Sequence, residues 1–426
     1  MNTLIKNATV RGHKNRVDIA ISGDIIADIA PHITHDCPHV IDADGKFVSA
    51  PFVDAHFHLD ATLTLVLTGV NKTGTVLEGI QMWKKLKPQL TVDMVKKRAL
   101  EYCHWAIARG ILAMRSHVDV CDDHLTLVDA LLEVKKEIAP YLDLQLVAFP
   151  QDGYFRHPNA IKNITRALDK GVDVIGGIPH YERTVQQGDE SLKAIMKTAS
   201  ERGIMVDIHC DETDDPHSRH IETLCAETVK YGMQGRVAGS HLVAMPRYGR
   251  FYFEKLKALL GESNMQIITN PQVNITLQGR LDGLEKRRGF APVVELQQLG
   301  LNIAMAQDCV LDPWYGSGRA EMLEVAHMGY HIAHMTAPEQ IESCFDMITT
   351  NPAKIMGLEK YGIAKGNYAD LIIFNAPNAI ECIRQKSERL VVMRRGKIIA
   401  KTEPAQTTVN IFNNIQTIDF ITKNTH

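Results

Sequence analysis

The chain has 426 residues, of which 45% are hydrophobic, and its formal net charge is −3. This length suffices for a large buried core and a smaller second unit. Because acidic and basic residues are interspersed, the charge pattern predicts neither a nucleic-acid-binding surface nor a surface for anionic membranes. Eight cysteines without a Cys-x-x-Cys pair indicate the reduced thiols of a cytoplasmic protein. No segment has the apolar core of a signal peptide or the length of a membrane span.

Both ends of the chain are predicted to form short β-strands. The N-terminal runs are "TLIKNATV", "RVDIAISGDIIADIAP" and "HVIDADGKFVSA", and the C-terminal runs are "ADLIIFNAP", "RLVVMRRGKIIA" and "TTVNIF". Turn-forming pairs such as Asp44-Gly45 separate them. We therefore expect residues 1–50 and 366–426 to build one small β-sandwich domain, with a catalytic domain of residues 51–365 inserted between them.

The middle of the chain alternates apolar runs with helical patterns. The apolar runs span residues 52–58, 110–119, 142–151, 172–180, 203–212, 235–242, 265–275 and 301–308. Most of them are spaced by roughly 30 residues, the size of one βα unit. Eight such units predict an α/β fold, a (β/α)8 TIM barrel. An open doubly wound sheet is the alternative, but no glycine-rich phosphate loop follows the first run.

One helical pattern illustrates how the units are delimited. Thr91 is a candidate N-cap, and Gly110 follows the last apolar position. Between them, the apolar stripe comprises Met94, Val95, Ala99, Cys103, Ala106 and Ile107. This spacing predicts an amphipathic helix that packs against the barrel.

Polar residues gather at the C-terminal ends of the predicted strands, where TIM barrels carry their chemistry. They are His56, His58, Gln151, His209, Glu212, His241 and Asp308. His56 and His58 are two residues apart, so on a strand they face the same side. A single histidine at a strand end is more often structural, but several on one barrel rim indicate a common site. Imidazole and carboxylate ligands suit zinc or ferrous iron.

Glu212 and two further histidines receive separate interpretations. Glu212 follows His209 by three residues and is the best candidate for a proton carrier. His117 and His180 also fall near strand ends, where they are interpreted as structural or as lining the substrate site.

These features resemble the amidohydrolase superfamily, through "PFVDAHFHLD", "HCDE", "GSH", Asp308 and the late "GIAKGNYADLIIF". Over nearly its full length the chain is more closely similar to the bacterial cytosine deaminases. The shared stretches include "AFPQ", "GGIPH", "DIHCDE", "NPQVNITLQGR", "KRRG" and "DPWY".

The resemblance implies a role for each site residue. The metal ligands would be His56, His58, His209 and Asp308, holding one divalent ion, Fe2+ or Zn2+. Many relatives bind two metals through a lysine after the fourth strand, but here that strand ends in "GGIPH". Gln151 would read the C2 carbonyl and N1 of a pyrimidine, Glu212 would carry a proton to N3, and His241 would orient or deprotonate the attacking water. Trp314 and the backbone near Val76 would line the pocket.

The implied reaction is hydrolytic deamination of a free pyrimidine base, with no nucleic-acid or membrane partner. Cytosine deaminases usually carry a second aspartate where this chain has Cys309, next to Asp308. A neutral thiol suits a methyl group better than a carboxylate does, so we expect 5-methylcytosine as the substrate, giving thymine and ammonia. This hypothesis requires the chain to bend at "DCVLDPW", because strand alternation would point Cys309 away from the face of Asp308.

Three alternatives stay open. The first is deamination of cytosine to uracil, as in cytosine or isoguanine deaminases. The second is hydrolysis of a cyclic amide by a different amidohydrolase, and the third is a non-catalytic scaffold. The resemblance further implies a homo-oligomer, such as a hexamer, that serves pyrimidine salvage.

Overall fold

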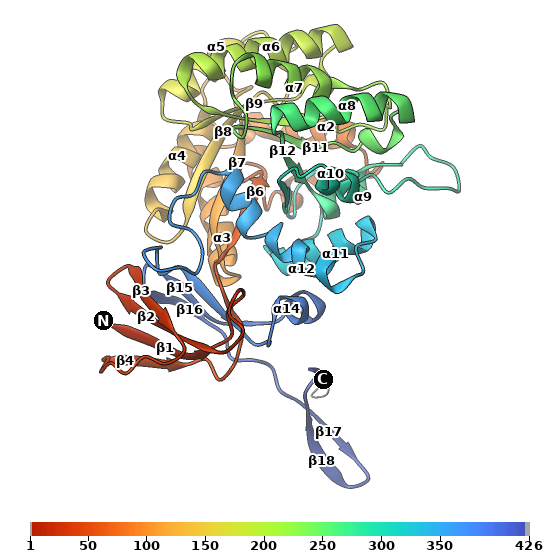
Figure 1. Ribbon diagram of the computed structural model, residues 1–426. Helices are drawn as coiled ribbons and strands as arrows, with labels where there is room; N and C mark the ends of the chain where they lie inside the picture. The colour runs from red at the N-terminus through yellow and green to blue at the C-terminus, as the bar shows by residue number, and fades with distance from the viewer. Residues whose placement is uncertain (1, 422–426) are drawn as a thin grey trace. The chain divides into compact units, whose positions relative to one another are not determined.

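The structure, a computed structural model, describes residues 2–421. The chain forms two compact units (Figure 1). One comprises Phe52–Leu358, and the other combines the chain up to Pro51 with the chain from Glu359 onward. Residues 359–365, which the sequence placed in the barrel domain, therefore belong to the second unit. Residues 1 and 422–426 of the predicted small domain lie outside the described residues.

Eight parallel strands form the sheet at the centre of the larger unit. They are β6 (Phe52–Phe57), β7 (Ile111–Asp119), β8 (Asp143–Phe149), β9 (Val174–Gly177), β10 (Met205–Cys210), β11 (Val237–His241), β12 (Gln266–Thr269) and β13 (Ile303–Met305). Each strand pairs with the next along the chain. A bridge between Phe57 and Asp308 closes the ring, with Asp308 N donating to His56 O at 2.9 Å. The predicted TIM barrel is confirmed.

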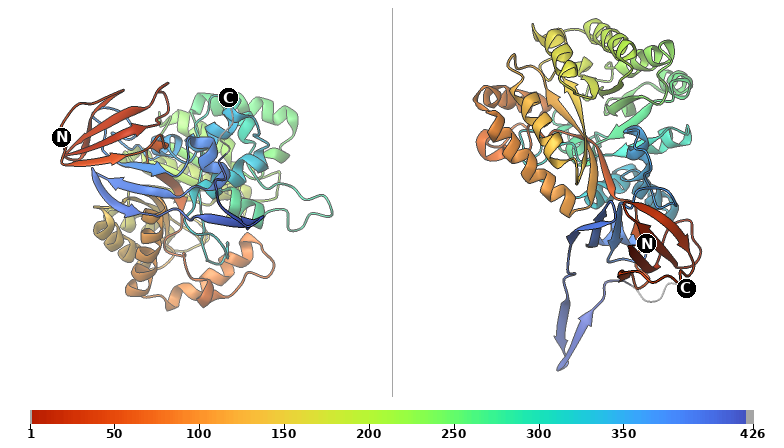
Figure 2. Two further views of the ribbon diagram at one scale, coloured as in Figure 1. Left: turned by 90° about the horizontal axis from the view of Figure 1, so that it is seen from below. Right: turned by 90° about the vertical axis from the view of Figure 1, so that its left-hand side faces the viewer.

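Helices surround these strands (Figures 1 and 2). The α-helices of this unit are α1 (Leu65–Thr68), α2 (Val76–Leu86), α3 (Val92–Ala108), α4 (Thr126–Ile138), α5 (Ala160–Asp169), α6 (Val185–Arg202), α7 (His220–Lys230), α8 (Arg250–Ser263), α9 (Pro271–Leu277), α10 (Val293–Gln298), α11 (Met322–Ala333), α12 (Pro338–Asp346) and α13 (Thr350–Ile355). Short 3-10 helices are η1 (Lys87–Gln89), η2 (Pro179–Tyr181) and η3 (Met245–Arg247). Within the described residues, no helix is both long and apolar enough to cross a membrane.

Helix α3 begins and ends where the sequence predicts. The Thr91 side chain accepts a hydrogen bond from Met94 N at 3.3 Å, so it caps the helix. Gly110, just beyond the helix, has φ of +83°, a conformation that glycine adopts without strain. Met94 was wrongly assigned to the buried stripe: it lies in the first turn and is 39% exposed. The other five members of the stripe are buried.

All eight barrel strands are shorter than the apolar runs that identified them, and two of these differences bear on the site. The run over 265–275 ends as a strand at Thr269, and α9 begins at Pro271. Proline lacks an N–H and has a fixed φ, so it favours the first turn of a helix over the interior of a sheet. The run over 301–308 ends as a strand at Met305, and the chain then bends into the barrel mouth.

The smaller unit is a sandwich of two four-stranded sheets. One sheet has the order β3-β2-β1-β4 and the other β16-β15-β14-β5. The strands are β1 (Thr3–Ala8), β2 (Val17–Ser22), β3 (Ile25–Ala30), β4 (His39–Asp42), β5 (Val48–Ser49), β14 (Leu371–Phe374), β15 (Arg389–Arg394) and β16 (Lys397–Lys401), with α14 (Ala379–Gln385) after β14. Ile19 and Leu371 share one core cluster, so both chain ends build this sandwich as predicted.

The predicted strand "TTVNIF" does not join either sheet of the sandwich. It forms β17 (Thr407–Ile411), which pairs with β18 (Asn414–Ile418) in a separate two-stranded hairpin. Its apolar side chains Ile411 and Ile415 are exposed.

Candidate active site

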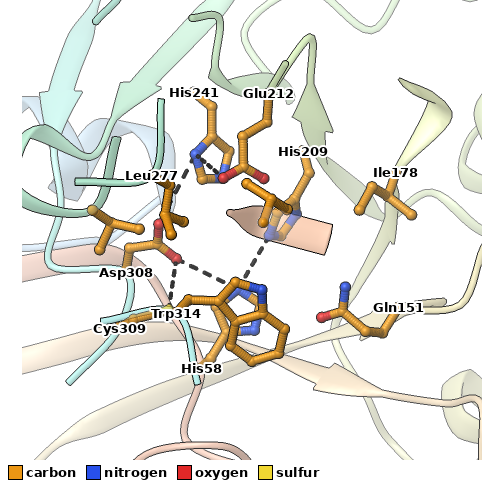
Figure 3. Close-up of a pocket in the computed structure, with 12 residues that line it drawn as sticks. His58, Gln151, Ile178, His209, Glu212, His241, Leu277, Asp308, Cys309 and Trp314 are labelled. Atoms are coloured by element: carbon orange, nitrogen blue, oxygen red, sulfur yellow. Dashed lines mark hydrogen bonds and ion pairs between the residues drawn. The ribbon is translucent and has the colours of Figure 1, made fainter. Parts of the chain in front are cut away.

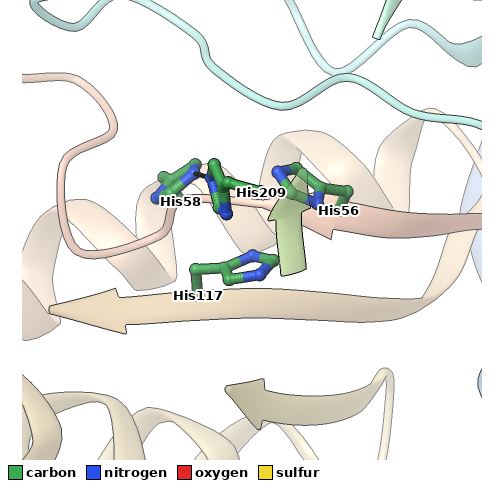
Figure 4. Close-up of side chains that lie close together, drawn as sticks. All are labelled: His56, His58, His117 and His209. Atoms are coloured by element: carbon green, nitrogen blue, oxygen red, sulfur yellow. Dashed lines mark hydrogen bonds between the residues drawn. The ribbon is translucent and has the colours of Figure 1, made fainter. Parts of the chain in front are cut away.

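The barrel mouth brings together three histidines from two strands. Strand β6 carries His56, His58 directly follows the end of that strand, and β10 carries His209. The Nε2 atoms of His58 and His209 lie 3.1 Å apart, and the ring centroids of His56 and His209 are separated by 4.6 Å (Figure 4). All three side chains are buried. Parallel strands end at the same rim of a barrel, which is why residues more than 150 positions apart meet here.

Asp308 reaches the same cluster from the segment after β13, which is bridged to the end of β6 where the ring closes. Its Oδ1 lies 3.6 Å from His56 Nε2 and 3.5 Å from His58 Nε2. Within the described chain, both ring nitrogens of His56 and Nδ1 of His209 have no hydrogen-bond partner. Burying polar atoms without partners is costly, and a cation among them would bind one nitrogen of each ring. The donor set of imidazoles and one carboxylate therefore fits a divalent metal ion such as zinc or ferrous iron.

Asp308 lies in a sharp bend that follows β13. Its φ is +66°, and Cys309 N donates to Gln307 O at 2.9 Å, the hydrogen-bond pattern of a γ-turn. In an extended strand, Asp308 and Cys309 would face opposite sides. The turn directs both into one pocket, with Cys309 Sγ 3.5 Å from Asp308 Oδ1 (Figure 3). The bend that the sequence hypothesis required is present.

A turn of the same kind places His241, the last residue of β11. His241 has φ of +74°, and Leu242 N donates to Ser240 O at 3.1 Å. A non-glycine residue at positive φ costs about 1–3 kcal/mol, and such strain is found mainly at functional sites. The His241 ring is held from behind by Asn274, whose Nδ2 lies 2.9 Å from His241 Nδ1.

Glu212 lies in the loop after β10 and faces this histidine. Its Oε1 is 3.5 Å from His241 Nδ1, and His241 Nδ1 is 3.9 Å from Asp308 Oδ2 (Figure 3). Burial raises the pKa of Glu212 to about 8. Burial also raises the pKa of Asp308 well above its usual range, reinforced by the neighbouring carboxylates of Glu212 and Asp312. A carboxyl group of this kind holds a proton at neutral pH and can deliver it to a bound base.

A pocket opens in front of these groups. It is lined by His58, Val76, Gln151, Ile178, His209, Glu212, His241, Val273, Leu277, Asp308, Cys309 and Trp314. The Trp314 ring lies over His58 at an interplanar angle of 27°. Gly79 of α2 lies directly behind Trp314, since a Cβ there would come within 2.5 Å of the indole. Sequence reasoning did not single out Ile178, Val273 and Leu277, because an apolar strand end or helix face carries no distinct signal.

His117, at the end of β7, joins the histidine cluster. Its ring centroid lies 4.3 Å from that of His56 and 4.6 Å from that of His209. Its ligand atoms lie within 4.8 Å of those of His56, His58 and His209 (Figure 4). The sequence located His117 near a strand end without assigning it to this group. His180 lies in η2 and is not among the residues that line the pocket.

Asp207 is a site residue that the sequence reasoning missed. Its Oδ1 lies 3.7 Å from His56 Nδ1 and 3.7 Å from His117 Nε2, and its Oδ2 accepts from Arg115 at 3.2 Å. Asp207 precedes His209 by two residues, so strand alternation would have placed both on the same face. An acid in a buried strand, two residues before a candidate ligand, was the available signal.

Buried imidazoles and a carboxylate converge at the mouth of this closed eight-stranded barrel and could hold a metal ion. The Amidohydrolase family model matches residues 39–400, and the chain belongs to this family. It is therefore a metal-dependent hydrolase acting on a C–N bond. The family that the sequence resembled is confirmed.

The solved structures include a close relative. The 5-methylcytosine deaminase from Klebsiella pneumoniae liganded with 5-fluorocytosine is 40% identical, with a TM-score of 0.92, and the match covers 94% of this chain and 98% of that one. Among curated proteins, N-isopropylammelide isopropyl amidohydrolase from Pseudomonas sp. (strain ADP) is 29% identical, over 94% of this chain and 97% of its own. Pterin deaminase from Rhizobium rhizogenes is 26% identical, over 91% and 89%.

Proposed function

We propose that this protein hydrolytically deaminates a free pyrimidine base and prefers 5-methylcytosine, which it converts to thymine and ammonia. The observation that carries the proposal is the position of Cys309, which lines the same pocket as Asp308, Glu212 and Gln151. The solved 5-methylcytosine deaminase at 40% identity supports it. Cytosine is the alternative substrate, since it differs only by the methyl group.

The proposed metal ligands are His56, His58, His209 and Asp308, binding one Fe2+ or Zn2+ ion. When bound, such an ion would supply a water-derived nucleophile at neutral pH. His241 Nδ1 lies 3.9 Å from Asp308 Oδ2, so His241 would orient the attacking water. Elemental analysis of the purified protein would identify the resident metal.

The proton steps are assigned to Glu212 and Asp308. Attack at C4 of the pyrimidine pushes electrons onto N3, so N3 must gain a proton as the tetrahedral carbon forms. Glu212 holds a proton because burial raises its pKa to about 8, and it faces the pocket. The departing amino group leaves as ammonia only after it is protonated, and Asp308 is placed to pass that proton.

Gln151 is the residue proposed to recognise the base. One amide offers both a donor and an acceptor, which match the N1–H and C2 carbonyl of a free pyrimidine. A sugar on N1 would remove that hydrogen and collide with Gln151. Nucleosides should therefore not react, and turnover of cytidine at a rate comparable to that of the free base would contradict this assignment.

Cys309 is proposed to select the methylated base. Burial raises the pKa of Cys309 well above its usual range, with Asp308 and Asp312 adding to the effect, so the thiol is neutral. A neutral thiol tolerates a methyl group beside it, and burying one carbon contributes about 0.8 kcal/mol. A carboxylate at this position would add a further charge next to Asp308 and lose its water when the methyl group closes over it.

The decisive experiment compares kcat/KM for 5-methylcytosine and cytosine in wild type and Cys309→Asp. A hydrophobic pocket discriminates one methyl group by ~10- to 200-fold, so wild type should favour 5-methylcytosine within that range and the variant should lose the preference. Cys210→Ala is a matched control, because Cys210 is buried beside His209 but does not line the pocket. A wild-type preference for cytosine, or a ratio unchanged in Cys309→Asp, would refute the assignment.

The homo-oligomeric state stays a prediction, and light scattering would test it.

A further inference from the structure

A buried lysine lies just outside the pocket. Lys87 begins η1, is 9% exposed, and donates to Asp119 Oδ2 at 2.6 Å and to Asp152 Oδ2 at 3.0 Å. Burial alone would lower the pKa of Lys87, but the carboxylates of Asp119 and Asp152 raise it above its usual value. The ammonium therefore stays charged in the interior, which is unfavourable unless its partners hold it firmly.

Each carboxylate that Lys87 binds is joined to a residue of the pocket. Asp152 directly follows Gln151, the residue proposed to read the base. Asp119 ends β7, and its Oδ2 also accepts from Trp83 Nε1 at 2.9 Å. The Trp83 ring lies 6.4 Å from the ring of Trp314, which walls the pocket. One ammonium group thus links the loop after β8 to the end of β7 and to α2.

We propose that Lys87 is a positioning residue that sets the amide of Gln151 against the edge of the substrate. Gln151 N donates to Phe149 O at 3.1 Å, which fixes the chain on one side of Gln151, and the Lys87–Asp152 contact fixes it on the other. Between these two restraints the amide keeps little freedom beyond its own side-chain rotations. A misplacement of ~1 Å can cost about 100-fold in rate. This inference rests on the proposed reading of the base by Gln151.

The experiment distinguishes a positioning role of Lys87 from a role in stability alone. Asp152→Ala leaves Lys87 paired with Asp119 as a neutral couple, so it is a milder change than Lys87→Met, which leaves two buried carboxylates without their cation. In Asp152→Ala we expect kcat/KM for 5-methylcytosine to fall by ~10- to 100-fold, mostly through KM, with bound metal unchanged. Asp152→Asn, which keeps the shape of the side chain, serves if Asp152→Ala does not fold.

A double-mutant cycle with Gln151→Ala supplies the decisive readout. If Lys87 and Asp152 act through Gln151, the double variant should lose about as much as Gln151→Ala alone, whereas independent effects multiply. Lys135→Met is the matched control: Lys135 pairs with Asp173 at 2.6 Å, and Asp173 accepts from Leu146 N of the same strand β8. This variant should leave KM unchanged.

The outcomes distinguish the two proposals. Losses that multiply in the double variant, or a rise in KM in Lys135→Met equal to that in Asp152→Ala, would overturn the positioning role while leaving Gln151 as the reader of the base. If Gln151→Ala itself leaves KM unchanged, the proposed reading of the base is wrong, and the positioning role falls with it.

Discussion

Two layers of buried polar groups fill the barrel, and they differ in how completely they are hydrogen bonded. In the lower layer, Arg115 donates to Gln145 Oε1 at 3.1 Å, to Asp207 Oδ2 at 3.2 Å and to Ile355 O at 3.1 Å. In the upper layer, both ring nitrogens of His56 and of His117 lack a hydrogen-bond partner in the described chain. The lower layer is complete in the protein alone, whereas the upper layer keeps unpaired nitrogens, of which a bound cation would take one from each ring that it contacts.

This difference indicates which buried groups stabilise the fold and which ones are available to bind a ligand. A buried network in which every polar group is hydrogen bonded stabilises the fold, and removing one member leaves an uncompensated charge. An unsatisfied cluster costs stability until a ligand binds it, so it is expected at a site that works on a ligand. Asp207 belongs to both layers, since it pairs with Arg115 below and faces His56 and His117 above.

The largest effect is expected from breaking the upper layer at His58. In His58→Ala we expect stoichiometric metal to be lost and turnover to fall below detection in a steady-state assay. The same protein should unfold near the temperature of metal-free wild type, because a bound ion stabilises the folded state. Elemental analysis and thermal unfolding check both points. Full activity in His58→Ala, or two metal ions per chain in wild type, would contradict the single-metal assignment.

Glu212 lies beside the upper layer rather than in it, so its loss should act on rate and not on metal. In Glu212→Gln we expect metal content to be retained and kcat to fall by ~10²- to 10⁴-fold. Loss of metal together with rate would show that Glu212 is a ligand.

The raised pKa of Glu212 also predicts a pH dependence. Because its pKa lies at about 8, the proton that N3 requires is present below pH 8 and is lost as the pH rises through that value. The kcat/KM of wild type should therefore decline above about pH 8. This decline should be absent from the residual activity of Glu212→Gln, and a decline of the same size in both proteins would assign the pH dependence to another group.

Arg115 tests the lower layer. Arg115→Met removes the cation and leaves Asp207 as a buried unpaired carboxylate, which typically costs about 3–5 kcal/mol. We expect this loss in the free energy of unfolding, measured by denaturant titration of both metal-loaded proteins. Lys170→Met is a suitable control, because the side chains of Lys170 and its partner Asp129 are 42% and 39% exposed and such a pair should contribute less. Equal losses in the two variants would mean that burial does not distinguish the pairs.

The sequence predicted the upper layer better than the lower one, for a physical reason. Strand ends can be recognised from apolar runs, and parallel strands bring their carboxyl ends to one rim, so His56, His209 and Asp308 could be grouped. Arg115 and Asp207 lie inside apolar runs, where their pairing across the barrel depends on register, which a single sequence does not reveal. The hypothesis on Cys309 required a bend within "DCVLDPW", but the sequence did not establish that the bend is a γ-turn at Asp308.

The smallest effect is expected at Asp207, where the two layers meet. A proton on His56 Nδ1 would face Asp207 Oδ1 at 3.7 Å and leave His56 Nε2 directed at Asp308 and the proposed ion. Carboxylates that orient a ligand imidazole in this way are typically worth 10- to 100-fold in metal affinity. In Asp207→Asn we therefore expect metal affinity, measured by competition with a chelator, to fall by ~10- to 100-fold.

Asp207→Asn also separates orientation of the ligand from general loss of stability. Arg115→Met and Asp207→Asn both break the Arg115–Asp207 pair, but only the second removes the negative charge that faces His56. If the carboxylate orients the ligand, metal affinity should fall much more in Asp207→Asn than in Arg115→Met, although Arg115→Met should unfold at lower denaturant. The alternative outcome is that the two variants lose metal affinity in proportion to their loss of stability. Asp207 would then only stabilise the fold together with Arg115, and packing alone would orient His56.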